Sequence, residues 1–436
     1  MGMGNRDRIQ SCLDYIEQNL KTELTAEEIS GMAGFSVFHF YRLFQSAVGM
    51  PVMQYITRRR LLWAAWEIAS GKKIVDTALL YGFDTSAGFY KAFVREFHCP
   101  PSEYARRFRV RKPYRINLFQ EEHVMLTNKK LKSILENWGM EHADVRNVRY
   151  ENTGEVNENV FEVGREHFLK ICTNLATVRK NIAIARALAE TGIASALPVM
   201  TKAGTDYVED GELYFILTVR IRGESLKLAD MFGSDYREKA RYLGEMLGQL
   251  HRILQRNDDI VCNEQNIFEE VRDLWLEPSK KAMQLSGEFC KEYLDAVEQW
   301  NGKLPEQIIH RDPNPSNIVI LDGVLAGFLD FDLSQRSIRL FDPCYTATAL
   351  LMEIFDSGEY EKLDRWVEVW QNILRGYDAV IHMTPEEKAA VPFVVLSIQL
   401  ICVGFFSGIE KLAPLAKTNI QMTQWLIAHR EELKYE

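Results

Sequence analysis

The sequence predicts a multidomain protein in which an all-α N-terminal domain precedes a larger α+β body. Its 436 residues exceed what one ordinary hydrophobic core accommodates, so two or three domains are expected. The first quarter consists of successive helical patterns separated by glycine turns. Strand-like apolar runs begin near residue 145 and are interspersed with further helical patterns. These observations favour a helical domain joined to a mixed one.

The composition is typical of a folded globular protein. Apolar residues make up 47% of the chain and charged residues 26%. The seven cysteines form no Cys-x-x-Cys pair, which argues against a metal ribbon or disulfide framework and favours a reducing, cytoplasmic location. Residues 1–10 lack the apolar core of a secretory signal, so none is expected.

One apolar segment approaches the length of a membrane span. Residues 391–409 contain Pro392, Ser397, Gln399 and Gly404, and no basic cluster flanks one side. We therefore expect a buried helix and no membrane partner, with a membrane span as the alternative.

The net charge of −9 conceals an asymmetry along the chain. Residues 1–115 carry 17 Lys and Arg against 11 Asp and Glu, whereas the remaining residues carry 35 against 50. A basic first quarter joined to an acidic body indicates a module that binds a polyanion, attached to a part that does not.

The first helical pair is predicted within residues 25–48. Thr25 and Glu28 form a capping-box pattern at the start of one helix, Gly34 marks the turn that ends it, and Ser36 caps the next. The apolar positions of the second helix recur at three- and four-residue steps and are expected to pack inward: Phe40, Leu43, Phe44 and Ala47.

The same arrangement repeats after a long connecting helix over residues 53–70. A helix over residues 74–81 ends at Gly82, and Asp84 or Thr85 begins the next one. In this last helix the aromatic positions recur at four-residue steps: Phe89, Phe93 and Phe97. The sequence therefore predicts two helix-turn-helix units.

These two units, and in particular the string GFDTSAGFYKAFVREFHCPPSEY, resemble the AraC/XylS-type DNA-binding domain over residues 5–109. The resemblance implies that the second helix of each unit enters a major groove of double-stranded DNA. The candidate contacts in the first unit are Phe38, His39, Tyr41 and Arg42. Those in the second unit are Ser86, Ala87, Tyr90 and Lys91. Arg58, Arg59 and Arg60 of the connecting helix are expected to act through phosphates or charge.

The body begins after a junction at residues 110–123, which switches from basic to acidic and contains Pro113. Its most informative stretch is residues 310–332, HRDPNPSNIVILDGVLAGFLDFD. Two prolines keep its first part out of a helix, and Asp322-Gly323 is a hairpin-turn dipeptide between two apolar runs. The hairpin therefore returns the chain to the loop from which it started.

This hairpin is expected to bring Asp330 and Asp332 to the end where Asp312 and Asn317 lie. One carboxylate can orient a hydroxyl and accept its proton, while an Asn and a second Asp can hold magnesium on nucleotide phosphates. The alternative to such a site is that these residues form two acidic turns around a buried hairpin, with their carboxylates exposed to solvent.

The pattern His-x-Asp-x-x-x-x-Asn followed by Asp-Phe-Asp resembles the aminoglycoside phosphotransferase and choline kinase group, relatives of the protein kinases. The resemblance implies a two-lobed, protein-kinase-like α+β fold, with lobes over residues 124–222 and 223–436, and ATP or GTP with Mg²⁺ as cofactors. It implies Asp312 as the catalytic residue and Asn317 and Asp330 as metal ligands. The implied structural supports are His310, Asp332 and Asp342.

Upstream residues complete the expected nucleotide site. Residues 159–163 and the strand that follows resemble a nucleotide-covering hairpin, which implicates Asn159 and the phosphate-contacting Lys170. Kinases orient this lysine with a helical glutamate, but Asn181 occupies that position here, which leaves full activity in question. Residues 222–226 resemble the hinge that holds adenine.

The last helices are expected to wall the pocket for a small-molecule acceptor or effector. They offer acidic groups and two indoles, Trp366 and Trp370, which suit a cationic ligand, although acids on helices are usually solvated. Three alternatives remain open: a ligand-sensing regulator, an active phosphotransferase with autoregulatory DNA binding, and a pseudokinase sensor. A homodimer is likewise an open alternative.

Overall fold

The computed structural model describes residues 5–435 except 49, 98, 108–109, 111, 114–117, 119–127, 150–155, 212 and 410–411. The chain forms two compact units. The first comprises residues 1–173 and 199–218, and the second comprises residues 174–198 and 219–436. The predicted domain boundaries near residues 109, 123 and 222 stay predictions.

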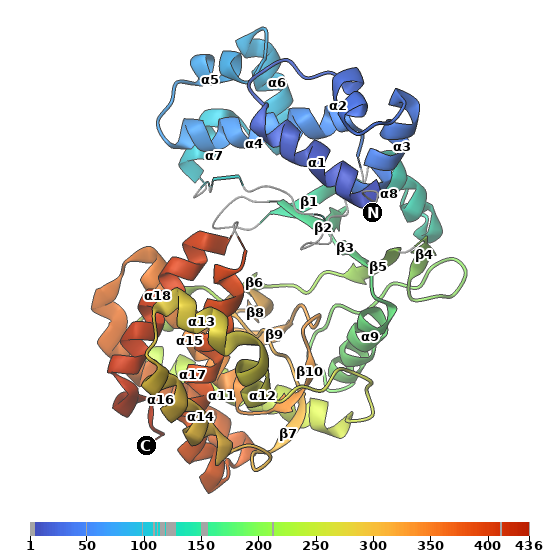
Figure 1. Cartoon of the computed structure of the whole chain (residues 1–436). Coiled ribbons are helices and arrows are strands. Elements are labelled where there is room, and N and C mark those ends of the chain that lie inside the picture. The colour runs from blue at the N-terminus through green and yellow to red at the C-terminus, as the bar shows by residue number, and fades with distance from the viewer. Residues whose placement is uncertain are drawn as a thin grey trace. The chain divides into compact units, whose positions relative to one another are not determined.

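The first unit begins with the predicted series of helices, drawn in blue to cyan in Figure 1. They are α1 (Asn5–Gln18), α2 (Ala26–Met32), α3 (Val37–Val48), α4 (Val52–Ala69), α5 (Ile74–Leu80), α6 (Ser86–Phe97) and α7 (Pro101–Arg107). The Thr25 side chain caps α2 by accepting from the backbone N–H of Glu28 at 3.2 Å. The Glu28 carboxylate, the other member of the predicted capping box, accepts a hydrogen bond from the Tyr15 hydroxyl at 2.5 Å. Thr25 therefore provides the side-chain cap of α2. Phe40, Phe44, Phe89, Phe93 and Phe97 are buried, as their spacing predicts.

The three consecutive arginines of α4 hold this helical domain together. Arg59 is 3% exposed and pairs with Glu17 through Nε at 2.5 Å and Nη2 at 3.0 Å. Arg58 pairs with Glu96 at 3.0 Å, and Arg60 donates to two backbone carbonyl oxygens at 2.9 and 2.7 Å. These guanidinium groups therefore act through charge and hydrogen bonds inside the domain, and a contact of any of them with DNA phosphates stays a prediction.

The same unit contains helix α8 (Asn128–Leu135) and a five-stranded sheet in the order β1-β2-β3-β5-β4. The strands are β1 (Val145–Arg149), β2 (Val156–Val163), β3 (His167–Cys172), β4 (Val208–Asp210) and β5 (Leu213–Val219). Pairing is antiparallel between β1 and β2, β2 and β3, and β4 and β5. Trp138, Phe161, Leu169 and Phe215 are buried in its core.

The second unit contains two small sheets among helices. In one sheet, β6 (Glu224–Ser225) and β9 (Val324–Phe328) flank β8 (Ile318–Leu321); in the other, β7 (Glu306–Ile309) pairs with β10 (Gln335–Ile338). Leu321 faces Val324 across the predicted hairpin turn, where Asp322 and Gly323 both have positive φ. This confirms the predicted hairpin, because an Asp-Gly pair tolerates positive φ at both central positions.

The helices of this unit, from green to red in Figure 1, enclose its largest hydrophobic core. They are α9 (Leu175–Ala189), α10 (Leu228–Met231), α11 (Tyr236–Arg256), α12 (Ile267–Glu270), α13 (Leu276–Met283), α14 (Gly287–Glu298), α15 (Phe341–Ser357), α16 (Leu363–Ile381), α17 (Pro385–Ser407) and α18 (Ala413–Ala428). Helices α11 and α16 approach closely at two glycines. A Cβ atom at Gly244 would lie 1.9 Å from the carbonyl oxygen of Ile373, and one at Gly376 would lie 1.9 Å from that of Arg241.

Helix α17 contains most of the apolar segment noted in the sequence. Among the described residues it is the one helix long and apolar enough to cross a membrane, and 56% of its most apolar window is buried within the protein. Ser397 and Gln399 are buried on it, and the Ser397 hydroxyl lies 2.7 Å from that of Tyr293 on α14. These contacts are those of a core helix.

Candidate active site and nucleic-acid interface

The loop after β7 is tied to the segment after β9 by His310. This side chain is fully buried, and its Nε2 donates to the carbonyl oxygen of Leu329 at 2.9 Å. Its Nδ1 accepts from the backbone N–H of Asp312 at 3.3 Å, and its ring lies 4.5 Å from that of Phe331. The imidazole therefore sets the spacing between the two segments that carry the acidic residues.

Asp342, at the start of α15, holds the backbone of the same loop. Its carboxylate accepts from the N–H groups of His310 at 2.8 Å and Arg311 at 2.9 Å, and from His251 Nε2 at 2.8 Å. Burial acts to raise the pKa of Asp342, but hydrogen bonds from His251 and the His310 backbone outweigh it and lower this pKa below its ordinary value. The structure thus places Asp342 where it can fix the turn that precedes Asp312.

Asp312 is surrounded by hydrogen-bond donors. Its carboxylate accepts from Asn314 Nδ2 at 2.9 Å, Asn317 Nδ2 at 3.2 Å and the Tyr345 hydroxyl at 2.8 Å. Burial raises the pKa of Asp312, while the hydrogen bonds from Asn314 and Tyr345 act in the opposite direction, and nearby Asp330 raises it further. A fixed carboxylate with a raised pKa can orient a hydroxyl group and accept its proton.

The returning hairpin brings Asp330 beside this loop. The backbone N–H of Leu329 donates to the carbonyl oxygen of Asn317 at 2.8 Å, and Asp330 has a φ of 60°. The Asn317 amide nitrogen also donates to the Asp312 carbonyl oxygen at 2.9 Å, which leaves its Oδ1 for another ligand.

These donors suit magnesium. The described residues contain no group of three or more His, Cys, Asp or Glu side chains that could hold a metal ion. An amide oxygen from Asn317 and a carboxylate from Asp330 nevertheless fit Mg²⁺, which takes one or two protein oxygen ligands and completes its shell with water and phosphate oxygens.

Helix α9 meets the end of the acidic segment. Asn181 Nδ2 donates to the Asp332 carboxylate at 2.6 Å, so the residue at the expected glutamate position contacts the second aspartate of Asp-Phe-Asp. The neighbouring Lys180, which is 8% exposed, donates to the carbonyl oxygens of Asp332 and Ser334, both at 2.7 Å.

The two predicted nucleotide contacts lie on adjacent strands of the first unit. Lys170 on β3 is directly opposite Val160 on β2. The backbone N–H of Asn159 donates to Asn157 Oδ1 at 3.0 Å, whereas the Asn159 Oδ1 is buried and has no hydrogen-bond partner among the described residues. Their roles toward nucleotide stay predictions.

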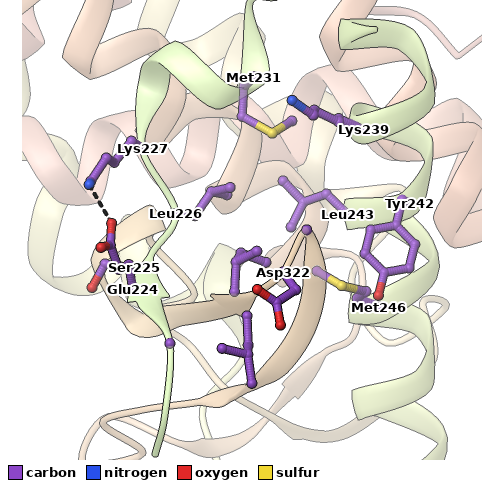
Figure 2. A pocket seen from close by; sticks show the side chains of 14 residues that line it. Glu224, Ser225, Leu226, Lys227, Met231, Lys239, Tyr242, Leu243, Met246 and Asp322 are labelled. Atoms are coloured by element: carbon purple, nitrogen blue, oxygen red, sulfur yellow. Dashed lines mark hydrogen bonds and ion pairs between the residues drawn. The ribbon is translucent and has the colours of Figure 1, made fainter.

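A hollow of about 430 Å³ lies at the segment predicted to be the hinge. Figure 2 shows Leu226, Met231, Leu243 and Met246 lining it, with Lys227 paired to Glu224 at 2.6 Å on one side. None of the loop residues 310–317 lines this hollow. It therefore differs from the site around Asp312.

Several site residues were missed by sequence reasoning. Tyr345 and Asn314 both donate to Asp312, and Lys180 holds the segment around Asp332. Asn314 could have been found from the Asn-Pro turn signal in the same loop. Tyr345 and Lys180 lie on helices far from this loop in the sequence, and no local sequence pattern points to either of them as part of the site.

The predicted acceptor indoles are unavailable to a ligand. Trp366 and Trp370 are both fully buried, with stacked rings 5.9 Å apart, and Trp366 Nε1 donates to the carbonyl oxygen of Ala347 at 2.8 Å. The expectation that they wall an acceptor pocket is wrong, because their helical spacing places them in the core.

The predicted DNA contacts lie on exposed faces of α3 and α6. Phe38 is 74% exposed and Tyr90 48% exposed, although both are aromatic. The other exposed candidates are His39, Arg42, Ser86, Ala87 and Lys91, while Tyr41 is half-buried. Exposed aromatic and basic groups on the second helix of each unit suit contact with DNA.

The sequence pattern of the Phosphotransferase enzyme family matches residues 151–380, which is more than half of the chain. The chain belongs to this family. A Helix-turn-helix domain pattern matches residues 19–107, so an AraC-type DNA-binding domain is fused to a phosphotransferase-family domain.

Curated relatives match the DNA-binding domain. The HTH-type transcriptional activator AarP of Providencia stuartii is 37% identical over 97 residues, which is 22% of this chain and 72% of AarP. The uncharacterized HTH-type transcriptional regulator YbfP of Bacillus subtilis strain 168 is 38% identical over 97 residues, but the chain spans only about a third of its length. These matches support a DNA-binding transcription regulator.

A solved structure resembles the body of the phosphotransferase-family chain. The microcompartment-associated aminopropanol kinase has a TM-score of 0.50 and 16% sequence identity, covering 70% of this chain and 97% of the kinase. At this identity the likeness shows the fold, which is the predicted kinase-like α+β architecture.

Proposed function

We propose that this protein is a cytoplasmic transcription regulator whose phosphotransferase-family domain binds ATP or GTP with magnesium and a small hydroxylated ligand. Occupancy of that domain changes the affinity of the helix-turn-helix units for DNA. The observation that carries the proposal is the arrangement of Asp312, Asn317 and Asp330 in the same chain as two exposed second helices. Such coupling requires a ligand to favour one arrangement of the chain over another.

The chemistry follows from the surroundings of Asp312. Its carboxylate accepts the proton of the ligand hydroxyl while the hydroxyl oxygen attacks the γ-phosphorus. The new P–O bond forms as the bond to the β,γ-bridging oxygen breaks, and the nucleoside diphosphate leaves with the electron pair. Asn314 and Tyr345 both donate to Oδ1 of Asp312 and Asn317 donates to Oδ2, which holds the carboxylate in place and limits the reorganisation needed during transfer.

The remaining residues would handle the nucleotide. Asn317 and Asp330 would hold the magnesium ion, which when bound neutralises charge on the phosphates. Lys170 would contact the phosphates, and Asn159 would contribute from the covering hairpin. The buried Oδ1 of Asn159, which has no hydrogen-bond partner in the described part of the chain, supports a ligand role for that side chain.

A contact within the first unit supports coupling between the two functions. Arg149, the last residue of β1, donates to the carbonyl oxygen of Glu96 at 2.6 Å. Its guanidinium lies 5.2 Å from the ring of Phe97, and burial lowers the Arg149 pKa. Both partners end α6, the second helix of the second DNA-binding unit. A strand of the sheet is therefore joined to a helix that carries predicted DNA contacts.

A second candidate function is active phosphorylation of a metabolite or antibiotic, with DNA binding used to regulate the protein's own expression. The full set of hydrogen bonds to Asp312 favours it, because such positioning serves proton transfer. The amide at position 181 favours the pseudokinase alternative, because no helical carboxylate is available there to orient a lysine.

The test combines DNA binding with turnover. A duplex selected by the full-length protein from a random pool is titrated without ligand, with the non-hydrolysable ATP analogue AMP-PNP plus magnesium, and with candidate acceptors added. Regulation by occupancy predicts a change in DNA affinity of about 5-fold or more. An affinity that stays the same at saturating nucleotide and acceptor contradicts the proposal.

Nucleotide consumption with the acceptor panel distinguishes the alternatives. If the protein is an active phosphotransferase, Asp312→Asn lowers turnover by about 10²- to 10⁴-fold and leaves DNA affinity unchanged. Equal turnover in the variant rejects the role of Asp312. Nucleotide binding without turnover of any acceptor supports a sensor.

A further inference from the structure

Helix α9 is held against the acidic segment by two adjacent side chains that the proposed chemistry does not use. Lys180 Nζ donates to the carbonyl oxygens of Asp332 and Ser334 at 2.7 Å, and Asn181 Nδ2 donates to the Asp332 carboxylate at 2.6 Å. We call these three hydrogen bonds the α9 latch. A charged donor forms stronger hydrogen bonds than a neutral one, and more so where water is excluded.

The latch acts on a segment that needs support. Asp330 has a φ of 60°, a conformation that costs free energy for a residue with a side chain and persists only where its surroundings impose it. Ser334 extends the contact, because its hydroxyl donates to the carbonyl oxygen of His310 at 3.2 Å. The latch thereby connects α9 with both the acidic segment and the loop that carries Asp312.

The segment after α9 is also fixed to the same unit. The backbone N–H of Ala194 donates to the carbonyl oxygen of Ala326 at 2.9 Å. A Cβ atom at Gly327 would lie 2.1 Å from the carbonyl oxygen of Ala194, so this approach requires glycine. The first half of α9 is therefore held at Asp332 and Ser334, and the segment after α9 is held at β9, which ends two residues before Asp330.

The identity of residue 181 follows from the same contact. A carboxylate at this position would place a second negative charge about one hydrogen-bond length from the Asp332 carboxylate. An amide donates to that carboxylate instead. Asn181 is thus suited to holding an aspartate in place, whereas a glutamate would be suited to holding a lysine.

We propose that Lys180 and Asn181 are positioning residues that hold the Asp330–Asp332 segment in its metal-binding arrangement before any ligand arrives. This inference rests on the proposed function, because it concerns how the segment that would hold magnesium is ordered. Residues that hydrogen-bond to metal-binding residues contribute measurably to metal affinity, although they do not touch the metal themselves.

The experiment uses the full-length protein and three variants. Lys180→Met keeps the side-chain length and removes the donors, and Asn181→Leu keeps the shape and removes the amide. Arg179→Met is the matched control, because Arg179 is the exposed neighbour on α9. Hydrogen exchange of residues 329–335 is followed without ligand, and AMP-PNP affinity is measured with magnesium and in EDTA.

Both latch variants are expected to speed exchange in residues 329–335 without ligand. They are also expected to reduce the gain in AMP-PNP affinity that magnesium provides by about 10- to 100-fold, with the affinity in EDTA unchanged. A role confined to general stability would lower both affinities together. The Arg179→Met variant is expected to match the unmodified protein in both measurements.

The inference is overturned if both latch variants show the same hydrogen exchange, and the same magnesium-dependent gain in AMP-PNP affinity, as the unmodified protein. If Lys180→Met does not fold, Asn181→Leu decides, because it removes one neutral donor and no charge. If the unmodified protein gains no AMP-PNP affinity from magnesium, the proposed nucleotide function fails. The exchange measurement still tests whether the α9 latch orders residues 329–335.

Discussion

At the scale of single residues, the loop before Asp312 depends on one buried carboxylate. Asp342 is fully buried and accepts hydrogen bonds from two backbone N–H groups and from His251. The other ring nitrogen of His251 lies 2.7 Å from the Tyr377 hydroxyl, so the network continues into α16. Loss of the carboxylate charge would weaken every donor bond that converges on it.

This network predicts a pH-dependent stability effect of Asp342→Asn. We expect the variant to lose about 3 kcal/mol of unfolding free energy at pH 7, because buried donors lose their charged acceptor. The folded-state pKa of Asp342 is lowered, so its contribution is complete above the unfolded pKa of about 4 and disappears as pH falls through the lowered value.

The measurement is urea unfolding of both proteins at pH 7, 5 and 3.5. The difference between them should stay constant from pH 7 to pH 5 and shrink at pH 3.5. Asp295→Asn, at an exposed position of α14, serves as control and should change little. A difference that grows on acidification would mean that the Asp342 pKa is raised instead.

At the scale of elements, the pairing of α11 with α16 relies on backbone approach at glycine. We expect Gly244→Ala to lower the unfolding free energy by about 3 kcal/mol, because its methyl group would meet the carbonyl group of Ile373 on α16. Gly287→Ala in α14 is the control, since its added methyl group meets no atom within 4 Å and should raise stability by up to about 1 kcal/mol. Thermal unfolding of both variants provides the comparison, and equal stability would show that the helices separate without cost.

Local pattern predicted the helices of the first unit and the hairpin around Asp322 and Gly323, because capping, periodicity and turn chemistry depend on neighbours in sequence. It failed where a distant partner decides the outcome. Arg59 was expected to act through phosphates or charge, and its charge pairs with Glu17 of α1 inside the domain, a partner that no local pattern indicates. Trp366 has the same helical spacing whether it lines a pocket or the core.

The candidate site shows the same division. The relation of Asp312 to Asn317 follows from one short loop, and the hairpin returns Asp330 to it, so these residues could be predicted. Tyr345 reaches Asp312 only because Asp342 fixes the start of α15 against the loop. Lys180 reaches Asp332 across more than 150 residues, a pairing that only the packing of α9 in the second unit determines.

At the scale of the whole molecule, regulation needs a route between the sheet and the DNA-binding helices. Arg149 begins such a route at the end of α6, and β1 is paired in turn with β2, which pairs with β3 and its Lys170. All of these elements belong to the first unit. A nucleotide that repositions these strands would therefore act on the helix that carries Tyr90 and Lys91.

Coupling of this kind must be reciprocal. If AMP-PNP with magnesium changes DNA affinity by a given factor, the selected duplex must change AMP-PNP affinity by the same factor, expected at about 5- to 150-fold.

We expect Arg149→Met to bring both factors toward one, because it removes the bond to Glu96 and the contact with Phe97. Arg146→Met is the control, since Arg146 lies on the same strand with its side chain exposed and paired to Asp144. Fluorescence anisotropy of labelled duplex and calorimetry of nucleotide binding measure the two factors. Retention of both factors in Arg149→Met would place the route elsewhere, and loss of DNA affinity alone would make Arg149 a support for α6.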